Sequence, residues 1–129
     1  MTIRVPDYIA TLKPYPPGKP LEELEREYGI KDSIKLASNE NPLGTSPRAL
    51  EAIRKHLIDL RRYPDGSGYY LKRRLSQRLG VEETSIVLGN GSNEIIDLIV
   101  RSFVQPKEEV LMSEPTFLVY PLMTQAVGA

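Results

Sequence analysis

The run GNGSNE, residues 89–94, holds the residues of this sequence that are most able to do chemistry. It follows a short apolar strand candidate, residues 86–88, and precedes an apolar helical run that begins at Ile95. A strand that turns through glycines into a helix leaves the first helical N–H groups without partners, and the helix dipole adds partial positive charge there. Residues 85–104 therefore predict a phosphate site, or else an ordinary strand-to-helix turn with Ser92 as its N-cap.

A second candidate is the polar loop SNENPLG, residues 38–44, which carries two asparagines. The amides of Asn39 and Asn41 both donate and accept hydrogen bonds, so they suit a carboxylate or phenolate oxygen of a ligand. The same loop also allows each asparagine to bond to its own backbone, with Pro42 and Gly44 shaping the turn. Taken alone, the residues of this loop favour the second, structural interpretation.

Aromatic side chains are a third candidate. Phe117 and Tyr120 come just after another strand candidate, residues 110–112, and ligands of α/β sheets bind beyond the carboxyl ends of the strands. Tyr15 and Tyr63 lie in proline-containing segments. An aromatic face suits stacking on a flat ring, and the alternative is that these residues fill a core.

Helical spacing and stop signals predict the elements that must position these residues. Glycine and proline residues mark the ends of the predicted elements. Between them leucine or isoleucine recurs every three or four residues. The predicted helices cover residues 21–28, 47–62, 69–79, 95–104 and a segment within 115–128, and the predicted strands cover 34–37, 86–88 and 110–112. Residues 1–20 hold five prolines and predict an extended arm without regular helix. The alternation after residue 80 is β-α-β-α, which is typical of a parallel α/β sheet.

The composition excludes several classes of function. With 129 residues, of which 40% are hydrophobic and 26% charged, the chain has the length and balance of one globular domain. Lys+Arg and Asp+Glu are 17 each, so no charge surplus indicates a nucleic-acid or anionic membrane partner. There is no cysteine for a disulfide or a thiolate nucleophile, and the one histidine, His56, cannot form a metal cluster. No apolar run approaches the roughly 20 residues that span a bilayer, so we expect a soluble cytoplasmic protein.

Five motifs together are more specific than any one of them. PYPPGKP, KLASNENPLG, RYPDG, GNGSNE and EPTFLVY occur in this order, and the combination resembles the N-terminal third of the histidinol-phosphate aminotransferases, which are fold-type-I enzymes that depend on pyridoxal 5′-phosphate (PLP). The resemblance extends over essentially the whole chain and implies an α/β fold. Residues 1–45 are then an N-terminal arm and small-domain segment. Residues 46–129 are the first part of a three-layer α/β/α PLP-binding large domain, incomplete in this chain.

The resemblance also implies contacts with the cofactor. The backbone of Gly91, Ser92 and Asn93 is expected to bind the PLP phosphate. Phe117, where family members commonly carry tyrosine, is expected to stack on the pyridine ring. Tyr63 is expected to reach the PLP phosphate of the other subunit, which implies a homodimer.

Two residues are expected near the substrate. Asn41 maps to a loop asparagine beside the amino-acid portion, and Tyr15 maps to an arm residue near the substrate phosphate. The implied reaction moves an amino group between L-glutamate and imidazole-acetol phosphate. It yields 2-oxoglutarate and L-histidinol phosphate, a step of histidine biosynthesis.

The family's Schiff-base lysine, its aspartate at the pyridine nitrogen and its carboxylate-binding arginine all lie beyond the matched segment. None of the seven lysines of this chain matches that lysine, so we expect no catalytic residue here and no activity of the chain alone. Two other interpretations stay open. One is a threonine-phosphate decarboxylase or aromatic aminotransferase of the same fold, and the other is a non-catalytic phosphate-binding or dimerisation module.

Overall fold

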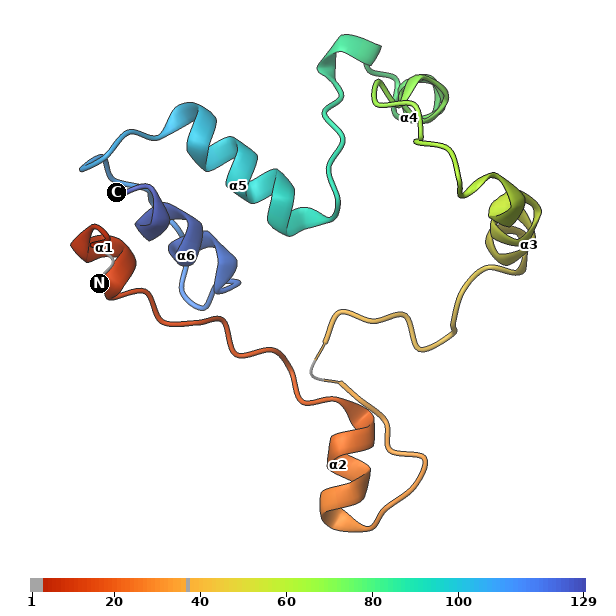
Figure 1. Cartoon of the computed structure of the whole chain (residues 1–129), viewed down its shortest axis with the longest axis horizontal. Coiled ribbons are helices and arrows are strands. Elements are labelled where there is room, and N and C mark those ends of the chain that lie inside the picture. Colours follow the sequence, from red (N-terminus) through yellow and green to blue (C-terminus); the bar gives the residue numbers. More distant parts are fainter. Residues whose placement is uncertain (1–3, 37) are drawn as a thin grey trace. The chain divides into compact units, whose positions relative to one another are not determined.

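The structure is a computed structural model that describes residues 4–36 and 38–129. Over these residues Figure 1 shows helices and no strand. The helices of the described residues are α1 (Asp7–Ala10), α2 (Leu21–Tyr28), α3 (Pro47–His56), α4 (Tyr69–Leu79), α5 (Ser92–Phe103) and α6 (Val119–Ala126), with short 3-10 helices η1 (Leu57–Asp59) and η2 (Glu83–Ser85). No helix in this part of the chain is both long and apolar enough to cross a membrane.

Two compact units form within the chain. The first unit consists of the residues up to Pro16 together with Tyr69–Ala129, and the second unit consists of Pro17–Gly68. The first unit therefore joins the N-terminal arm to the C-terminal half of the sequence. The domain boundary expected between residues 45 and 46 is a different division, and it stays a prediction.

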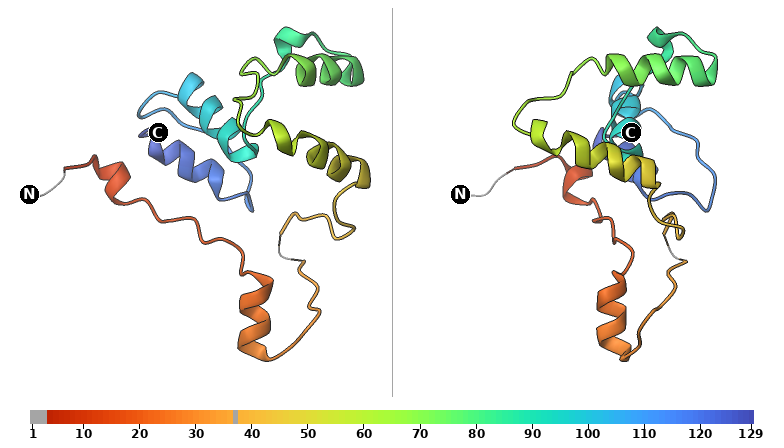
Figure 2. Two further views of the ribbon diagram at one scale, coloured as in Figure 1. Left: turned by 45° about the vertical axis from the view of Figure 1, so that its right-hand side comes forward. Right: turned by 90° about the vertical axis from the view of Figure 1, so that its right-hand side faces the viewer.

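The buried centre of the first unit is the contact between α5 and α6, which lie side by side in Figures 1 and 2. Ile96 and Val100 lie one turn apart on α5 and pack against Val119 at the start of α6. All three side chains are buried, and Val119 is only 2% exposed. Three partly buried side chains extend this core: Val104, Met123 and Val127.

The arm contains one short helix, which corrects the expectation of an arm without regular helix. The cause is the absence of proline between Pro6 and Pro14. In this interval the N–H groups of Ile9 and Ala10 donate to the carbonyl of Pro6, at 2.9 and 3.0 Å. Pro6 itself precedes the helix, where its missing N–H has no intrahelical role. The resulting turn, α1, contacts α6.

The longer helices begin and end at local signals. In the second unit α2 ends at Gly29, whose φ of 65° is the left-handed conformation that favours glycine. The next helix, α3, begins with Pro47 at its first position, directly after Ser46. The predicted bounds of α2 and α4 are confirmed to the residue.

The predicted strands do not form, and this is the main correction to the expected secondary structure. No strand is present at residues 34–36, 86–88 or 110–112, although the backbone of Ile86 is extended (φ −112°, ψ 119°). Ala37, the last residue of the first predicted strand, lies outside the described residues. A strand needs a neighbouring strand to accept its hydrogen bonds, and none of these three segments pairs with another in the described part of the chain.

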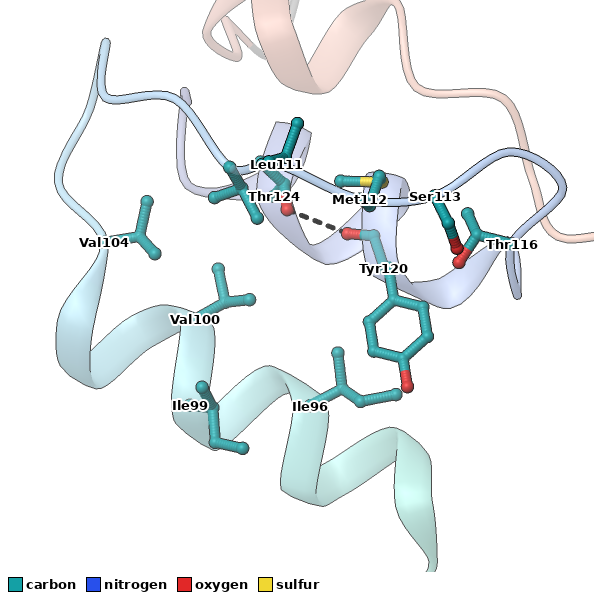
Figure 3. A pocket seen from close by; sticks show the side chains of 11 residues that line it. Ile96, Ile99, Val100, Val104, Leu111, Met112, Ser113, Thr116, Tyr120 and Thr124 are labelled. Atoms are coloured by element: carbon teal, nitrogen blue, oxygen red, sulfur yellow. Dashed lines mark hydrogen bonds between the residues drawn. The ribbon is translucent and has the colours of Figure 1, made fainter.

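An apolar groove lies beside the last of these segments. Residues 110–113 run beside α5 and α6, and the space between them has a volume of about 410 Å³ (Figure 3). Its walls are mainly aliphatic: Ile96, Ile99, Val100, Val104, Val110 and Leu111. Leu111 is fully exposed, so the outer edge of the groove is uncovered apolar surface.

Large apolar side chains of the described residues are exposed in both units. Leu36 is 92% exposed and Ile58 is 81% exposed in the second unit, and Leu111 is fully exposed in the first. Contiguous apolar surface of this kind is typical of protein–protein contacts.

We expect residues 1–129, expressed alone, to lack a cooperative unfolding transition, because the small α5–α6 core buries too little apolar area to offset the entropy of ordering the chain. Urea titration followed by far-UV circular dichroism is the measurement, with the fluorescence of an apolar dye reporting exposed hydrophobic surface. A single sigmoidal transition with low dye fluorescence would contradict this expectation.

Candidate anion-binding turn and aromatic cluster

The glycine turn ends in the N-terminus of α5, as the sequence predicts. Gly91 is the N-cap, with φ 85° and ψ 171°, a conformation that residues with a side chain rarely adopt. A Cβ built on Gly91 would meet no atom within 4 Å, so the space beside the turn is open. The N–H groups of Ser92 and Asn93 belong to the first turn of the helix and have no acceptor within it. The turn can therefore receive an anion.

The two glycines of the turn serve different purposes. A Cβ on Gly89 would lie 2.7 Å from Cδ1 of Ile95 and 3.2 Å from Oε2 of Glu94. Position 89 thus needs a glycine because side chains of the helix lie close to its backbone. Position 91 needs a glycine because its φ is positive. The spacing of the two glycines does not by itself distinguish these causes.

Glu94 braces the turn, and the sequence analysis missed this role. Its carboxylate accepts a hydrogen bond from the N–H of Asn90. The glutamate is at the third helical position, as in a capping box, but it bonds the N–H of the residue before the N-cap, so the spacing from Gly91 to Glu94 was the available signal. The carboxylate satisfies an N–H that precedes the helix and leaves the N–H groups of the first helical turn for another acceptor.

Phe117 lies in an aromatic cluster within the same unit. Its ring centroid is 6.0 Å from that of Tyr15, at an interplanar angle of 82°, and 6.3 Å from that of Tyr120, at 89°. Both pairs are edge-to-face contacts, which are favourable for aromatic rings. All three rings are roughly two-fifths exposed, so they are not core residues. The structure thus brings the arm residue Tyr15 to Phe117, two predicted site residues that are distant in sequence.

Asn41 and Tyr63 lie in the second unit. The Asn41 side chain donates to the carbonyl of Gly44 at 2.8 Å and accepts from the N–H of Leu43 at 3.1 Å, so it shapes its own loop. One amide hydrogen and one lone pair are still available to a ligand. Tyr63 is fully exposed in the turn that follows η1, which leaves its hydroxyl accessible.

The expectation that this chain holds no catalytic residue stays a prediction. The one pKa clearly displaced among the described residues is that of Arg101, which is raised by the hydrogen bond and charge of Asp97, 2.8 Å away. That arginine stays protonated and lies on an exposed helix face. The side chain of His56 is 75% exposed, and Nδ1 lies 4.0 Å from Asp59. Within residues 4–36 and 38–129 no group of three His, Cys, Asp or Glu side chains is placed to hold a metal ion. The site is therefore suited to holding an anion and a flat ring.

Comparison with known proteins identifies related molecules. A histidinol-phosphate aminotransferase of Desulfotalea psychrophila is 56% identical over 128 residues, which are 99% of this chain and 34% of that protein. Histidinol-phosphate aminotransferase 2 of Pseudomonas aeruginosa is 55% identical over 123 residues, which are 94% of this chain and 33% of that protein. The chain thus spans about a third of the length of the curated relatives it matches.

A solved structure gives the same result for the fold. The crystal structure of histidinol-phosphate aminotransferase from Sinorhizobium meliloti in complex with pyridoxal-5′-phosphate matches with a TM-score of 0.81 and 28% sequence identity. The match covers 99% of this chain and 34% of that one. It confirms the predicted fold class, a part of a fold-type-I aminotransferase whose α/β/α layers are incomplete here. The sequence profile of the family described as aminotransferase class I and II matches residues 31–129, which is most of the sequence, so the chain belongs to this family.

Proposed function

We propose that this chain is the part of a histidinol-phosphate aminotransferase that holds the phosphate and one ring face of PLP. The observation that carries the proposal is the structural match over 99% of the chain to a histidinol-phosphate aminotransferase in complex with pyridoxal-5′-phosphate. The names of the two relatives that are more than 50% identical support the same substrate. Because the chain spans about a third of these proteins, the activity is proposed for a longer protein that contains it.

The residues present fit PLP in two respects. The open space beside Gly91 and the first N–H groups of α5 suit a phosphate, which gains both hydrogen bonds and the favourable helix dipole. The partly exposed ring of Phe117 suits stacking on a pyridine ring, for which the absence of the tyrosine hydroxyl is no obstacle. The Glu94 carboxylate accepts its hydrogen bond from Asn90, so it does not occupy the N–H groups of Ser92 and Asn93.

The contribution of this chain is binding and orientation. PLP, when bound, supplies the electron sink for amino transfer. The backbone of Gly91, Ser92 and Asn93 fixes one end of the cofactor, and Phe117 fixes the plane of its ring. Proton transfer requires side chains outside residues 1–129, since none of the lysines here corresponds to the family's catalytic lysine.

The remaining assignments follow the family pattern. The substrates are L-glutamate and imidazole-acetol phosphate, with 2-oxoglutarate and L-histidinol phosphate as products. Asn41 contacts the amino-acid portion and Tyr15 the substrate phosphate. Tyr63 contacts the PLP phosphate of a second copy, so the enzyme is a homodimer, and we place it in the cytoplasm. The exposure of Tyr63 supports its intersubunit contact.

The first test uses a chimera in which residues 1–129 replace the matching segment of the Desulfotalea psychrophila relative. We expect it to transfer the amino group of L-histidinol phosphate to 2-oxoglutarate, measured by coupled detection of glutamate, because at 56% identity the replaced surfaces should still pack. The unmodified relative is the positive control.

The same assay separates the alternatives. Preference for an aromatic amino acid, or release of carbon dioxide from threonine phosphate, would replace the proposed substrate with another of the same fold. A folded chimera that binds PLP but transforms none of these substrates would contradict the enzymatic proposal and favour a binding module.

The role of the α5 backbone is tested by Ser92→Pro in the chimera. Proline at the first helical position removes one N–H and preserves the helix. We expect the Kd for PLP to rise by at least about tenfold, the range for a hydrogen bond to a charged group. Ser92→Ala, which removes the hydroxyl and keeps the N–H, should change the Kd by less than about threefold. Equal effects of the two substitutions would show that the backbone N–H does not bind the phosphate.

The intersubunit role of Tyr63 is tested by Tyr63→Phe. We expect the Kd for PLP to rise by about tenfold, because one hydrogen bond to a phosphate is lost. Mixed dimers of Tyr63→Phe and Ser92→Pro subunits give the sharper result. If Tyr63 acts across the interface, each mixed dimer has one intact site with the unaltered Kd. If no site of unaltered affinity appears in titrations of the mixed dimers, the contact across the interface is excluded.

A further inference from the structure

The side chain of Gln125 on α6 bonds the N-terminal arm to the C-terminal helix. Its Nε2 atom donates to the backbone carbonyl of Tyr8 at 3.0 Å and to Oγ1 of Thr11 at 3.1 Å. These bonds join residues that are more than 110 positions apart in sequence. They are therefore tertiary contacts that place the arm, and local structure does not require them.

The hydrogen-bond chemistry at this contact is complementary. The amide of Gln125 has two N–H groups, and both are used. The Thr11 hydroxyl donates to the carbonyl of Asp7 at 2.9 Å, which leaves its lone pairs for Gln125. The Tyr8 carbonyl can only accept, so the amide nitrogen, and not its oxygen, must face the arm. Ionised glutamate has nearly the same shape but cannot donate to the Tyr8 carbonyl, and it could bond to Thr11 only by taking that hydroxyl's proton bond from Asp7.

A glycine also takes part in the contact between the arm and α6. A Cβ on Gly128, which follows α6 with φ 83°, would lie 3.2 Å from Cε1 of Tyr8. The ring of Tyr8 thus packs on the backbone after α6, beside the hydrogen bonds of Gln125. The arm is held on the end of α6 both by polar bonds and by close packing.

Prolines explain why the arm needs such an attachment. Pro14, Pro16 and Pro17 have no N–H, so this stretch cannot join a sheet through regular backbone pairing. Beyond Thr11 the arm borders a groove of about 420 Å³ against α6, between Pro14 and Tyr15 on one side and Leu118 and Leu122 on the other. The groove shows that this stretch is loosely packed. Its position therefore depends on the contacts at its two ends.

Tyr15 is the far end of that stretch, and its ring lies edge-to-face with Phe117. Gln125 fixes the near end. We propose that Gln125 is a positioning residue: it docks the arm so that Tyr15 supports the ring of Phe117 and meets the bound ligand. This inference rests on the proposed function, in which Phe117 stacks on PLP.

The test is made in the chimera and begins with its cofactor-free form. Hydrogen–deuterium exchange of residues 4–16 reports docking of the arm directly. Gln125→Glu should raise exchange at the amides of α1, because the carboxylate cannot donate and repels the Tyr8 carbonyl. Gln77→Glu, the same change on the exposed face of α4, is the matched control and should leave exchange of the arm unchanged.

The second measurement is the Kd for PLP. We expect Gln125→Glu to raise it about tenfold, and Tyr15→Ala to have an effect of similar size, since both remove support from Phe117. The double variant should bind no more weakly than Tyr15→Ala alone, because Gln125 acts through Tyr15. Thr11→Val keeps the shape of the side chain and removes both the acceptor for Gln125 and the donor to Asp7, so it should raise the Kd by about threefold without altering α6.

The outcomes separate this inference from the proposed function. Failure of the unsubstituted chimera to bind PLP would overturn the proposed function, and the positioning role with it, whereas exchange of the arm would still decide whether Gln125 docks it. If the chimera binds PLP and Gln125→Glu has the same Kd, or the same arm exchange, the inference is wrong while the function stands. A double variant weakened by the full product of the two single effects would also overturn it.

Discussion

The arrangement of this chain depends on the packing of α5 against α6. Val119 inserts beside Ile96 and Val100, and these are the only buried apolar side chains among the described residues. The N-terminus of α5 carries the glycine turn, and the segment leading into α6 carries Phe117. This one small apolar contact thus determines where the glycine turn, which suits a phosphate, lies relative to Phe117, whose ring suits stacking. Loss of that contact would loosen their relation, because it is the buried part of the packing between α5 and α6.

A binding site of this kind uses backbone and aromatic groups in place of ionisable side chains. The N–H groups of a helix end carry partial charge without a titrating group, so their attraction for a phosphate does not vary with pH on the protein side. Gly91 makes the approach possible, and Glu94 holds the preceding turn. Under the proposed function this chain binds and orients the cofactor, and proton transfer is assigned to residues that it does not contain. This division agrees with the one-third coverage of the relatives.

The one-third coverage of the relatives also accounts for the exposed apolar surface. Residues 86–88 and 110–112 have the apolar composition of buried strands, yet no strand pairs with them in the described structure. The groove beside residues 110–113 and the exposed side chains of Leu36, Ile58 and Leu111 are surfaces without a covering layer. Helices tolerate this situation because their hydrogen bonds are internal, whereas strands do not form without neighbours. For this reason the described part of an α/β fold contains helices and no strands.

The sequence by itself determined what depends on neighbouring residues. The bounds of α2 and α4, the start of α3 after Ser46, and the turn at Gly91 all follow from capping residues, glycine angles and apolar spacing. Only the tertiary structure decided the rest. Whether residues 110–112 form a strand, whether Gly89 makes room for a ligand or for Ile95, and where Tyr15 lies all depend on atoms distant in sequence. Gln125 had no local signal, because the two groups that it binds lie more than 110 residues away and only folding brings them together.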